Sequence, residues 1–190
     1  MPVLHVRIPD ERIGVVIGPG GSTKRRLEEQ TRTRIQIDPD EGEVELASDD
    51  PGDPTGVLKA RDMVLAIGRG FSPDRAARLL RDDTYLGVID IKRVTGHRDK
   101  AGLWRIRSRL IGAQGRARAR IEELSGASVS VFGSTVAVIG QERQLESATR
   151  AVELLLRGSE HSAVFHLLAR MRRDQAVESA LTPPDGADEV

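Results

Sequence analysis

Hydrophobic and polar residues follow the same order of patterns in the two halves of this chain. The first half predicts a strand, two short helices, two strands and a longer helix, at residues 4–8, 12–17, 23–31, 33–37, 43–47 and 55–67. The first helix must end at Gly18, because this glycine and Pro19 cannot continue it, and Ser22 is expected to cap the second helix. An acidic turn at 38–42 joins the two strands.

The second half predicts the same elements again, at residues 86–94, 103–111, 116–124, 128–132, 135–139 and 141–156. The order β-α-α-β-β-α thus occurs twice, which indicates an α+β protein with one domain at 1–71 and another at 85–158. We also predict a linking helix within 72–84, a C-terminal helix at 159–175 and a disordered acidic tail at 176–190.

An internal repeat supports this division into two domains. Residues 17–29 align without gaps with residues 111–123, at a constant offset of 94 positions. The matched pairs include Lys24 with Arg118, Leu27 with Ile121 and Ile35 with Val129. A second match aligns residues 60–70 with residues 148–158. Two matches in the same order indicate a tandem duplication.

The charges of the chain are unevenly distributed, although 29 basic and 29 acidic residues give a formal net charge of zero. Residues 92–120 hold ten basic side chains and one acidic one, Asp99, for a local charge of +9. Residues 38–54 hold eight acidic side chains and no basic one, and residues 174–190 add five more acids. A basic block of this kind can bind phosphate, while the acidic segments discourage indiscriminate binding.

Composition excludes several other classes of protein. The chain has no cysteine, which rules out disulfide scaffolds, thiolate zinc sites and cysteine nucleophiles. No apolar run approaches the roughly 20 residues that cross a bilayer, and no signal peptide opens the sequence. We therefore expect a soluble, cytoplasmic protein.

Each repeat carries a Gly-x-x-Gly loop between its two short helices, at 18–21 and 112–115. The glycines allow a nucleic-acid backbone to approach closely, and the following helix directs its positive end at phosphate. A Walker A loop would follow a strand and read Gly-x4-Gly-Lys-Ser/Thr, whereas here Gly21-Ser-Thr-Lys24 has a different residue order and follows a helix. A dinucleotide-binding fingerprint would need a third glycine at the position of Thr23. A plain helix–helix turn remains the alternative, but two copies with the same flanking residues favour phosphate binding.

The residues that carry catalysis in other proteins form no recognisable site. The four histidines lack metal-ligand spacing, and no serine has a supporting base. The pairs Glu28-Glu29 and Glu122-Glu123 are expected on solvated helix faces. We predict that the protein is not an enzyme and uses no cofactor or metal.

The loop sequences, in this order of elements, resemble the type I KH domain. Residues 3–173 as a whole are similar to the archaeal Pno/Dim-type ribosome-biogenesis factors, which contain two KH domains; the most specific phrases are at 61–73, 123–131 and 157–164. The resemblance implies three-stranded antiparallel sheets packed on helices. It also implies a groove for about four single-stranded nucleotides, formed by the two short helices, the loop and the middle strand.

The resemblance also implies which residues bind RNA. The principal site, in the second domain, would comprise a backbone clamp, nearby arginines and an apolar floor: Arg109, Ile111, Gly112, Ala113, Gln114, Gly115, Arg116, Arg118, Arg120, Val129 and Val131. An auxiliary site in the first domain would comprise Gly18, Pro19, Gly20, Gly21, Lys24 and Arg25. It is expected to be weaker, because Pro19 removes a backbone donor and an acidic turn lies nearby. Trp104 could stack on a base, but a core or interface position is the expectation.

By the same resemblance, the protein would bind the 3′-terminal region of the small-subunit rRNA during assembly and assist its maturation. Its possible partners would be a Nob-type endonuclease, the alpha subunit of translation initiation factor two and a Rio-type kinase. Two alternatives stay open: a general KH protein acting on mRNA or in an exosome, and a scaffold without an important RNA contact.

Overall fold

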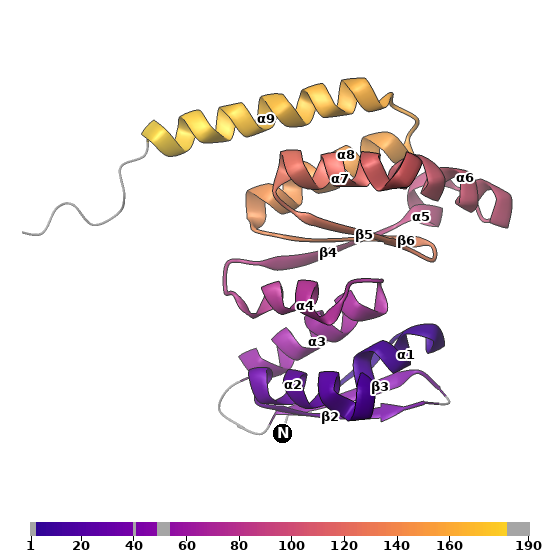
Figure 1. The fold of residues 1–190 in the computed structure, drawn as a ribbon, viewed down its shortest axis with the longest axis vertical. Coiled ribbons are helices and arrows are strands. Elements are labelled where there is room, and N and C mark those ends of the chain that lie inside the picture. Colours follow the sequence, from indigo (N-terminus) through magenta and orange to yellow (C-terminus); the bar gives the residue numbers. More distant parts are fainter. Residues whose placement is uncertain (1–2, 40, 49–53, 182–190) are drawn as a thin grey trace, which may run out of the picture.

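The computed structural model describes residues 3–39, 41–48 and 54–181 (Figure 1). The first unit contains β1 (Val3–Arg7), α1 (Asp10–Ile17), the 3₁₀ turn η1 (Pro19–Gly21), α2 (Ser22–Thr31), β2 (Thr33–Asp38), β3 (Glu43–Ser48) and α3 (Thr55–Gly68). Its three strands are antiparallel in the order β1-β3-β2. Strand β3 alternates between exposed and buried positions, with Val44 and Leu46 fully buried and Glu43 exposed, because only one face of this sheet packs on helices.

The second unit repeats this architecture, with one additional short helix. It contains β4 (Tyr85–Asp90), α5 (Ile91–Thr95), α6 (Lys100–Ile111), the 3₁₀ turn η3 (Ala113–Gly115), α7 (Arg116–Ser125), β5 (Ser128–Phe132), β6 (Thr135–Gly140) and α8 (Glu142–Leu156). Its strands are antiparallel in the order β4-β6-β5. The α+β class and the two three-stranded antiparallel sheets packed on helices are confirmed.

The strand predicted at 86–94 is wrong at its C-terminal end. It stops at Asp90, whose carboxylate accepts hydrogen bonds from the backbone N–H groups of Lys92, at 2.8 Å, and Arg93, at 3.2 Å. An aspartate that satisfies these donors is an N-cap, so the apolar residues that follow begin helix α5 instead of continuing the strand.

The connecting and C-terminal segments also differ from the prediction in detail. The linking helix is divided into α4 (Pro73–Ala76), capped by Ser72, and the 3₁₀ turn η2 (Ala77–Leu80). The C-terminal helix α9 (His161–Leu181) extends past the predicted end at 175, so residues 176–181 are helical and not a disordered tail. The rest of the predicted tail, 182–190, lies outside the described residues.

The middle strand of the second sheet, β6, is buried on both faces, which sets it apart from the middle strand of the first sheet, β3. Every residue of β6 is buried, and Ala137 and Ile139 of this strand pack into the hydrophobic core of the first unit. Figure 1 shows α3 and α4 between the two sheets, with α7, α8 and α9 beyond the second sheet. The first unit therefore covers the face of the second sheet that its own helices leave open.

Polar contacts fix this arrangement at the edge of the second sheet. The Arg12 guanidinium donates to the carbonyl oxygens of Ile67, at 2.8 Å, and Phe71, at 2.7 Å, and lies 5.5 Å from the ring centroid of Phe132. Burial lowers the pKa of Arg12 below its usual value. Arg78 donates to the Ser128 hydroxyl at 2.6 Å. Arg12 of the first unit and Arg78 of the linking segment thus connect these parts of the chain to β5 of the second unit.

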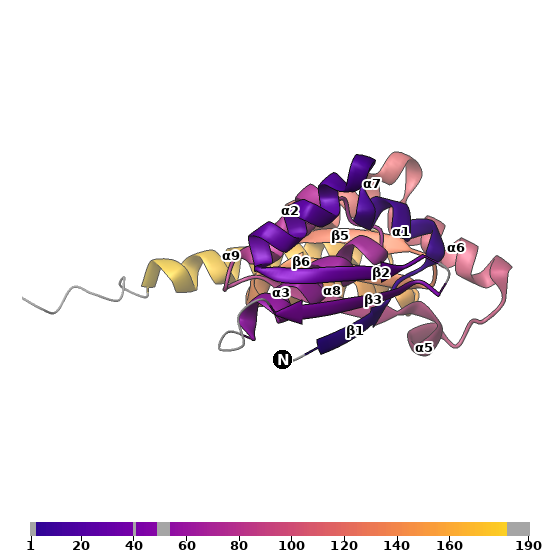
Figure 2. The same ribbon diagram turned by 90° about the horizontal axis from the view of Figure 1, so that it is seen from below.

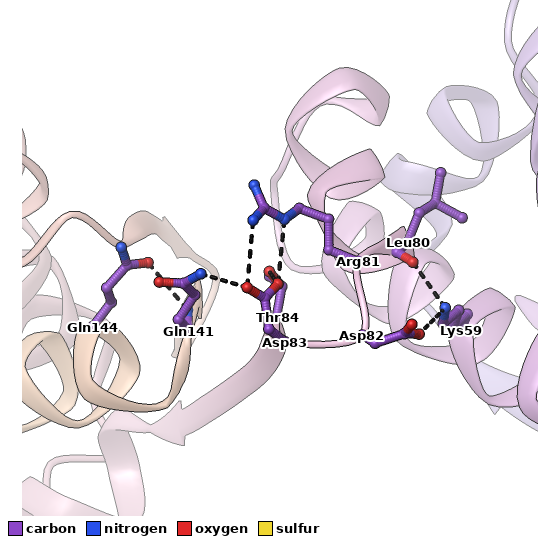
Figure 3. Close-up of polar contacts among 8 residues, drawn as sticks. All are labelled: Lys59, Leu80, Arg81, Asp82, Asp83, Thr84, Gln141 and Gln144. Carbon is purple, nitrogen blue, oxygen red and sulfur yellow. Dashed lines mark hydrogen bonds and ion pairs between the residues drawn. The ribbon is translucent and has the colours of Figure 1, made fainter. Parts of the chain in front are cut away.

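The segment between η2 and β4 is tied to both units (Figure 3). Lys59 Nζ donates to the carbonyl oxygen of Leu80 at 2.8 Å and to the Asp82 carboxylate at 2.6 Å. Asp83 accepts hydrogen bonds from Gln141 and Arg81, and these bonds lower the pKa of its carboxyl group. Because Lys59 belongs to the first unit and Gln141 to the second, these contacts fix the position of the two units relative to each other.

Candidate nucleic-acid interface

The two glycine loops have the same backbone conformation. Gly112, Gln114 and Gly115 have φ values of 73°, 55° and 76°, and the residues 94 positions earlier, Gly18, Gly20 and Gly21, have 71°, 56° and 77°. Figure 2 shows the following helices, α2 and α7, on the same side of the molecule. The duplication inferred from the sequence is thus preserved down to single backbone angles.

The helices after the loops begin without a side-chain cap. Ser22 does not cap α2 as predicted: Gly21 occupies the cap position in a left-handed conformation, and Ser22 is the first helical residue. Gly115 does the same for α7. No side chain accepts a hydrogen bond at either cap; the backbone N–H groups of the first helical residues, Ser22 and Arg116, donate instead to the loop carbonyl oxygens of Pro19 and Ala113.

The two glycines of a loop are required for different reasons. A Cβ at Gly112 would lie 2.7 Å from the Ala117 Cβ and 2.9 Å from its backbone nitrogen, so only glycine lets the loop pack on α7. A Cβ at Gly115 would meet nothing within 4 Å, although its φ of +76° disfavours other residues. Gly115 therefore faces open space, where a ligand can approach.

One glutamate of each predicted solvated pair has a structural role. Glu28 Oε1 accepts from the backbone N–H of Ile35 at 2.9 Å, and Glu122 Oε1 accepts from that of Val129 at 2.6 Å. Their side chains are only 25% and 20% exposed. The expectation of solvated faces was therefore wrong for Glu28 and Glu122, which tie α2 to β2 and α7 to β5.

The apolar residues predicted as the floor of the groove lie at different depths. Ile111 and Val131 are half-buried, whereas Val129 is only 1% exposed and belongs to the core of the second unit. Strand β5, which carries both valines, lies at the edge of the sheet, and β6 is the middle strand. The strand expected to line the groove is therefore an edge strand of the sheet and not its middle one.

Arginine side chains around the second loop include buried donors without a partner. Within the described part of the chain, the buried side-chain nitrogen and oxygen atoms that lack a hydrogen-bond partner are the Nε atoms of Arg107, Arg109 and Arg118. All three flank the loop at 112–115. Each of these Nε atoms is covered by protein, while the residues that carry them remain partly exposed. Arg107 was missed, although it lies in the +9 segment that signalled it.

Three of the predicted arginines of the second unit also donate hydrogen bonds to other groups of the chain. The Arg109 Nη2 donates to the carbonyl oxygen of Gly158 at 3.1 Å and closely to that of Ser159, so part of this side chain holds the turn that follows α8. Arg116 Nε donates weakly to the Ala113 carbonyl oxygen at 3.3 Å, and Arg120 pairs with Glu123 at 2.7 Å. Arg116 and Arg120 remain exposed.

In the first unit, the basic residues that follow the loop all have partners. Lys24 pairs with Glu28 at 3.7 Å, and the Arg25 guanidinium donates back to the Gly20 carbonyl oxygen at 2.8 Å. Arg26 pairs with Asp74 at 2.9 Å. The two loops therefore share a backbone but differ in the cations available to a ligand.

Comparisons with known proteins agree with this geometry. A family model described as a eukaryotic type KH-domain (KH-domain type I) matches residues 85–173, and a KH domain model matches residues 3–66. A KH domain-containing protein of Methanocaldococcus jannaschii is 40% identical over 168 residues, which cover 88% of this chain and 73% of the relative. The chain belongs to the Pno/Dim-type family of KH-domain ribosome-biogenesis factors.

Two further relatives are informative. The pre-rRNA-processing protein pno1 of Aspergillus fumigatus is 31% identical over 147 residues, which cover 76% of this chain and 58% of that relative. Dim2p of Pyrococcus horikoshii OT3, in a crystal structure of an a/eIF2alpha-aDim2p-rRNA complex, is 49% identical. Its TM-score is 0.85, and the match covers 91% of this chain and 95% of that one.

Trp104 lies on the surface of the second KH domain. Its side chain is 67% exposed on α6, beside the exposed Lys100 and Arg105, so the expected core or interface position is wrong.

No group of three or more histidine, aspartate and glutamate residues that could hold a metal ion occurs among the described residues. A separate finding concerns membranes: no helix in the part of the chain described by the structure is long and apolar enough to cross one.

The glutamate contacts yield a testable prediction about the scaffold of the KH groove. Glu122→Ala leaves both the Val129 N–H and the Arg75 guanidinium without their shared acceptor, so the free energy of unfolding should fall by about 1–3 kcal/mol in urea titrations. The matched control is Glu123→Ala, which removes an exposed pair with Arg120 and should cost less than about 0.5 kcal/mol. Equal losses for the two variants would contradict the role assigned to Glu122.

Proposed function

We propose that this protein binds single-stranded RNA through its second KH domain during assembly of the small ribosomal subunit. The RNA would lie near the 3′ end of the small-subunit rRNA, where bound protein would assist maturation. The observation that carries the proposal is the second glycine loop, in which Gly115 faces open space beside the exposed Arg116 and the partly exposed Arg118. An RNA backbone provides anionic acceptors for these two guanidinium groups.

The second loop combines several features that suit a sugar-phosphate backbone. Gly115 leaves the surface open, the first N–H groups of α7 have no side-chain cap, and Arg116 and Arg118 lie on the first turn of α7. Bases would lie against Ile111 and Val131, where the groove allows contact with their Watson–Crick edges. The phosphates would thereby position the strand, and the groove would discriminate among bases.

The first KH domain would act as an auxiliary site. Its loop has the same backbone, but the cations beside it are engaged by Glu28, Gly20 and Asp74, and Pro19 lacks an N–H donor. A phosphate would have to displace existing contacts of Lys24 and Arg26 before it could bind there. Its affinity for RNA should therefore be lower.

The partners of this protein are proposed from its relatives. The Pyrococcus horikoshii complex contains a/eIF2alpha and rRNA together with Dim2p, and we propose the same two partners here. A Nob-type endonuclease and a Rio-type kinase are proposed from the family resemblance alone. In this account the protein presents RNA to other factors and performs no catalysis itself, and it acts in the cytoplasm.

Matched substitutions in the two loops test the division of labour between the domains. Gly21 and Gly115 both have positive φ and open space for a side chain, so aspartate imposes similar strain at the two positions. Gly115→Asp places a carboxylate where phosphate would bind and should lower RNA affinity by about tenfold or more. Gly21→Asp should change affinity about threefold or less. Filter-binding titrations with single-stranded segments of small-subunit rRNA measure both, and equal losses would refute the assignment.

Crosslinking in cells separates this function from a general KH role on mRNA. Ultraviolet crosslinking of the intact protein, followed by sequencing of the attached RNA, should recover mainly the 3′ region of the small-subunit rRNA. The Gly115→Asp variant should lose most of this signal, whereas Gly21→Asp should retain it. A wild-type profile dominated by messenger RNA would overturn the ribosomal assignment while leaving RNA binding intact.

A further inference from the structure

A cavity opens between α7 and α9 in the second unit. It has a volume of about 500 Å³ and lies between the second glycine loop and the start of α9. Gly112 and Ala113 form its border with the loop, and His161 and Phe165 of α9 form the opposite wall. The cavity is therefore continuous with the loop that would clamp the RNA backbone.

The wall formed by α9 is held firmly in place. The His161 Nε2 lies 3.0 Å from the carbonyl oxygen of Arg109, and the Arg109 guanidinium in turn holds the carbonyl oxygens of Gly158 and Ser159. Val164 and Leu168 on the same helix are each 1% exposed and belong to the second core. The first turns of α9 thus form a preformed surface beside the loop.

The lining of this cavity has the chemistry of a nucleotide site. The rings of His161 and Phe165 lie one helical turn apart, with centroids separated by 5.9 Å, and Phe165 is only half-buried. Arg116 and Arg120, four positions apart on α7, line the other side. An aromatic surface beside two guanidinium groups suits a base that stacks and a phosphate that carries negative charge.

The two sides of α7 separate this cavity from the groove. Glu122 faces β5 and α4, where it accepts from the Val129 N–H and from Arg75, whereas Arg116 and Arg120 face α9. A nucleotide in the cavity would therefore lie outside the four that the groove accepts. The strand would reach it by continuing across Gly112 and Ala113.

The first unit closes the corresponding position. Arg26, which is equivalent to Arg120 by the offset of 94, pairs with Asp74 of α4 at 2.9 Å. In the second unit Arg120 pairs instead with Glu123 on its own helix, and the space beside it remains open. The cavity is thus a feature of the domain that we propose as the principal RNA site.

We propose that this cavity binds one unpaired nucleotide of the same RNA strand, immediately outside the KH groove, with its base stacked on Phe165. This inference rests on the proposed RNA-binding function and extends the binding site from the groove to α9. The C-terminal helix is then part of the RNA-binding surface and not only a support for α7 and α8.

Oligonucleotide length provides the test. Fluorescein-labelled single-stranded RNAs of four nucleotides from the 3′ region of small-subunit rRNA are compared with the same RNAs extended by two nucleotides at either end. In fluorescence anisotropy titrations, extension at one end should raise wild-type affinity about tenfold. An abasic nucleotide at the added position should abolish this gain.

Substitutions at Phe165 assign the gain to the cavity. Phe165→Leu keeps an apolar side chain but removes the ring, so the gain should fall to about twofold or less while four-nucleotide binding stays unchanged. Phe165→Tyr should preserve the gain in affinity. His166 is exposed and does not line the cavity, so His166→Ala is the control and should also preserve the gain. Thermal unfolding checks that all variants fold.

Several outcomes would overturn the inference. These are an absence of any gain in the wild type, a gain that survives Phe165→Leu, and an equal loss for short and long RNAs in that variant. If the wild type binds four nucleotides and loses them in Gly115→Asp, failure at the cavity leaves the proposed function intact. If the wild type binds none of these RNAs, the proposed function itself fails and the cavity proposal fails with it.

Discussion

The structure depends on the burial of β6, the middle strand of the second sheet, on both faces. Strand β6 has helices of its own unit on one side and the core of the first unit on the other, which Ala137 and Ile139 enter directly. Removing this contact would expose apolar side chains that have no other cover. The two units therefore form one body, in which α2 and α7 lie on the same side (Figure 2).

The duplication preserved a scaffold and allowed two sites to diverge. Both units retain the loop angles, the glutamate that holds the edge strand, and a buried hydroxyl on the last turn of the second short helix, Thr31 and Ser125. The two units differ in the residues that surround the glycine loop and the helix that follows it. The linking segment supplies Asp74 to an arginine of the first unit, whereas α9 leaves arginines and an aromatic surface accessible in the second.

Local features were predictable from the sequence, and tertiary ones were not. Glycine spacing located both loops, because positive φ at Gly18 and Gly112 depends on the residue itself. One sequence feature did indicate the docking of the two units: residues 135–140 of β6 are all uncharged, as expected for a strand covered on both faces, whereas glutamates alternate with apolar residues in β3. The roles of Arg109 and Glu122 depend on partners 49 and seven residues away, which no local pattern reveals. Trp104 was misplaced because its exposure contradicts the usual burial of large aromatic residues.

Amide hydrogen exchange gives the most direct test of the central claim, that RNA binds at the second loop. Exchange is measured by mass spectrometry on the full chain, with and without a saturating single-stranded RNA from the 3′ region of small-subunit rRNA. The account predicts that RNA slows exchange about tenfold or more at residues 112–120 and changes it little at residues 18–26. Equal protection of the two loops, or protection confined to the first, would contradict it.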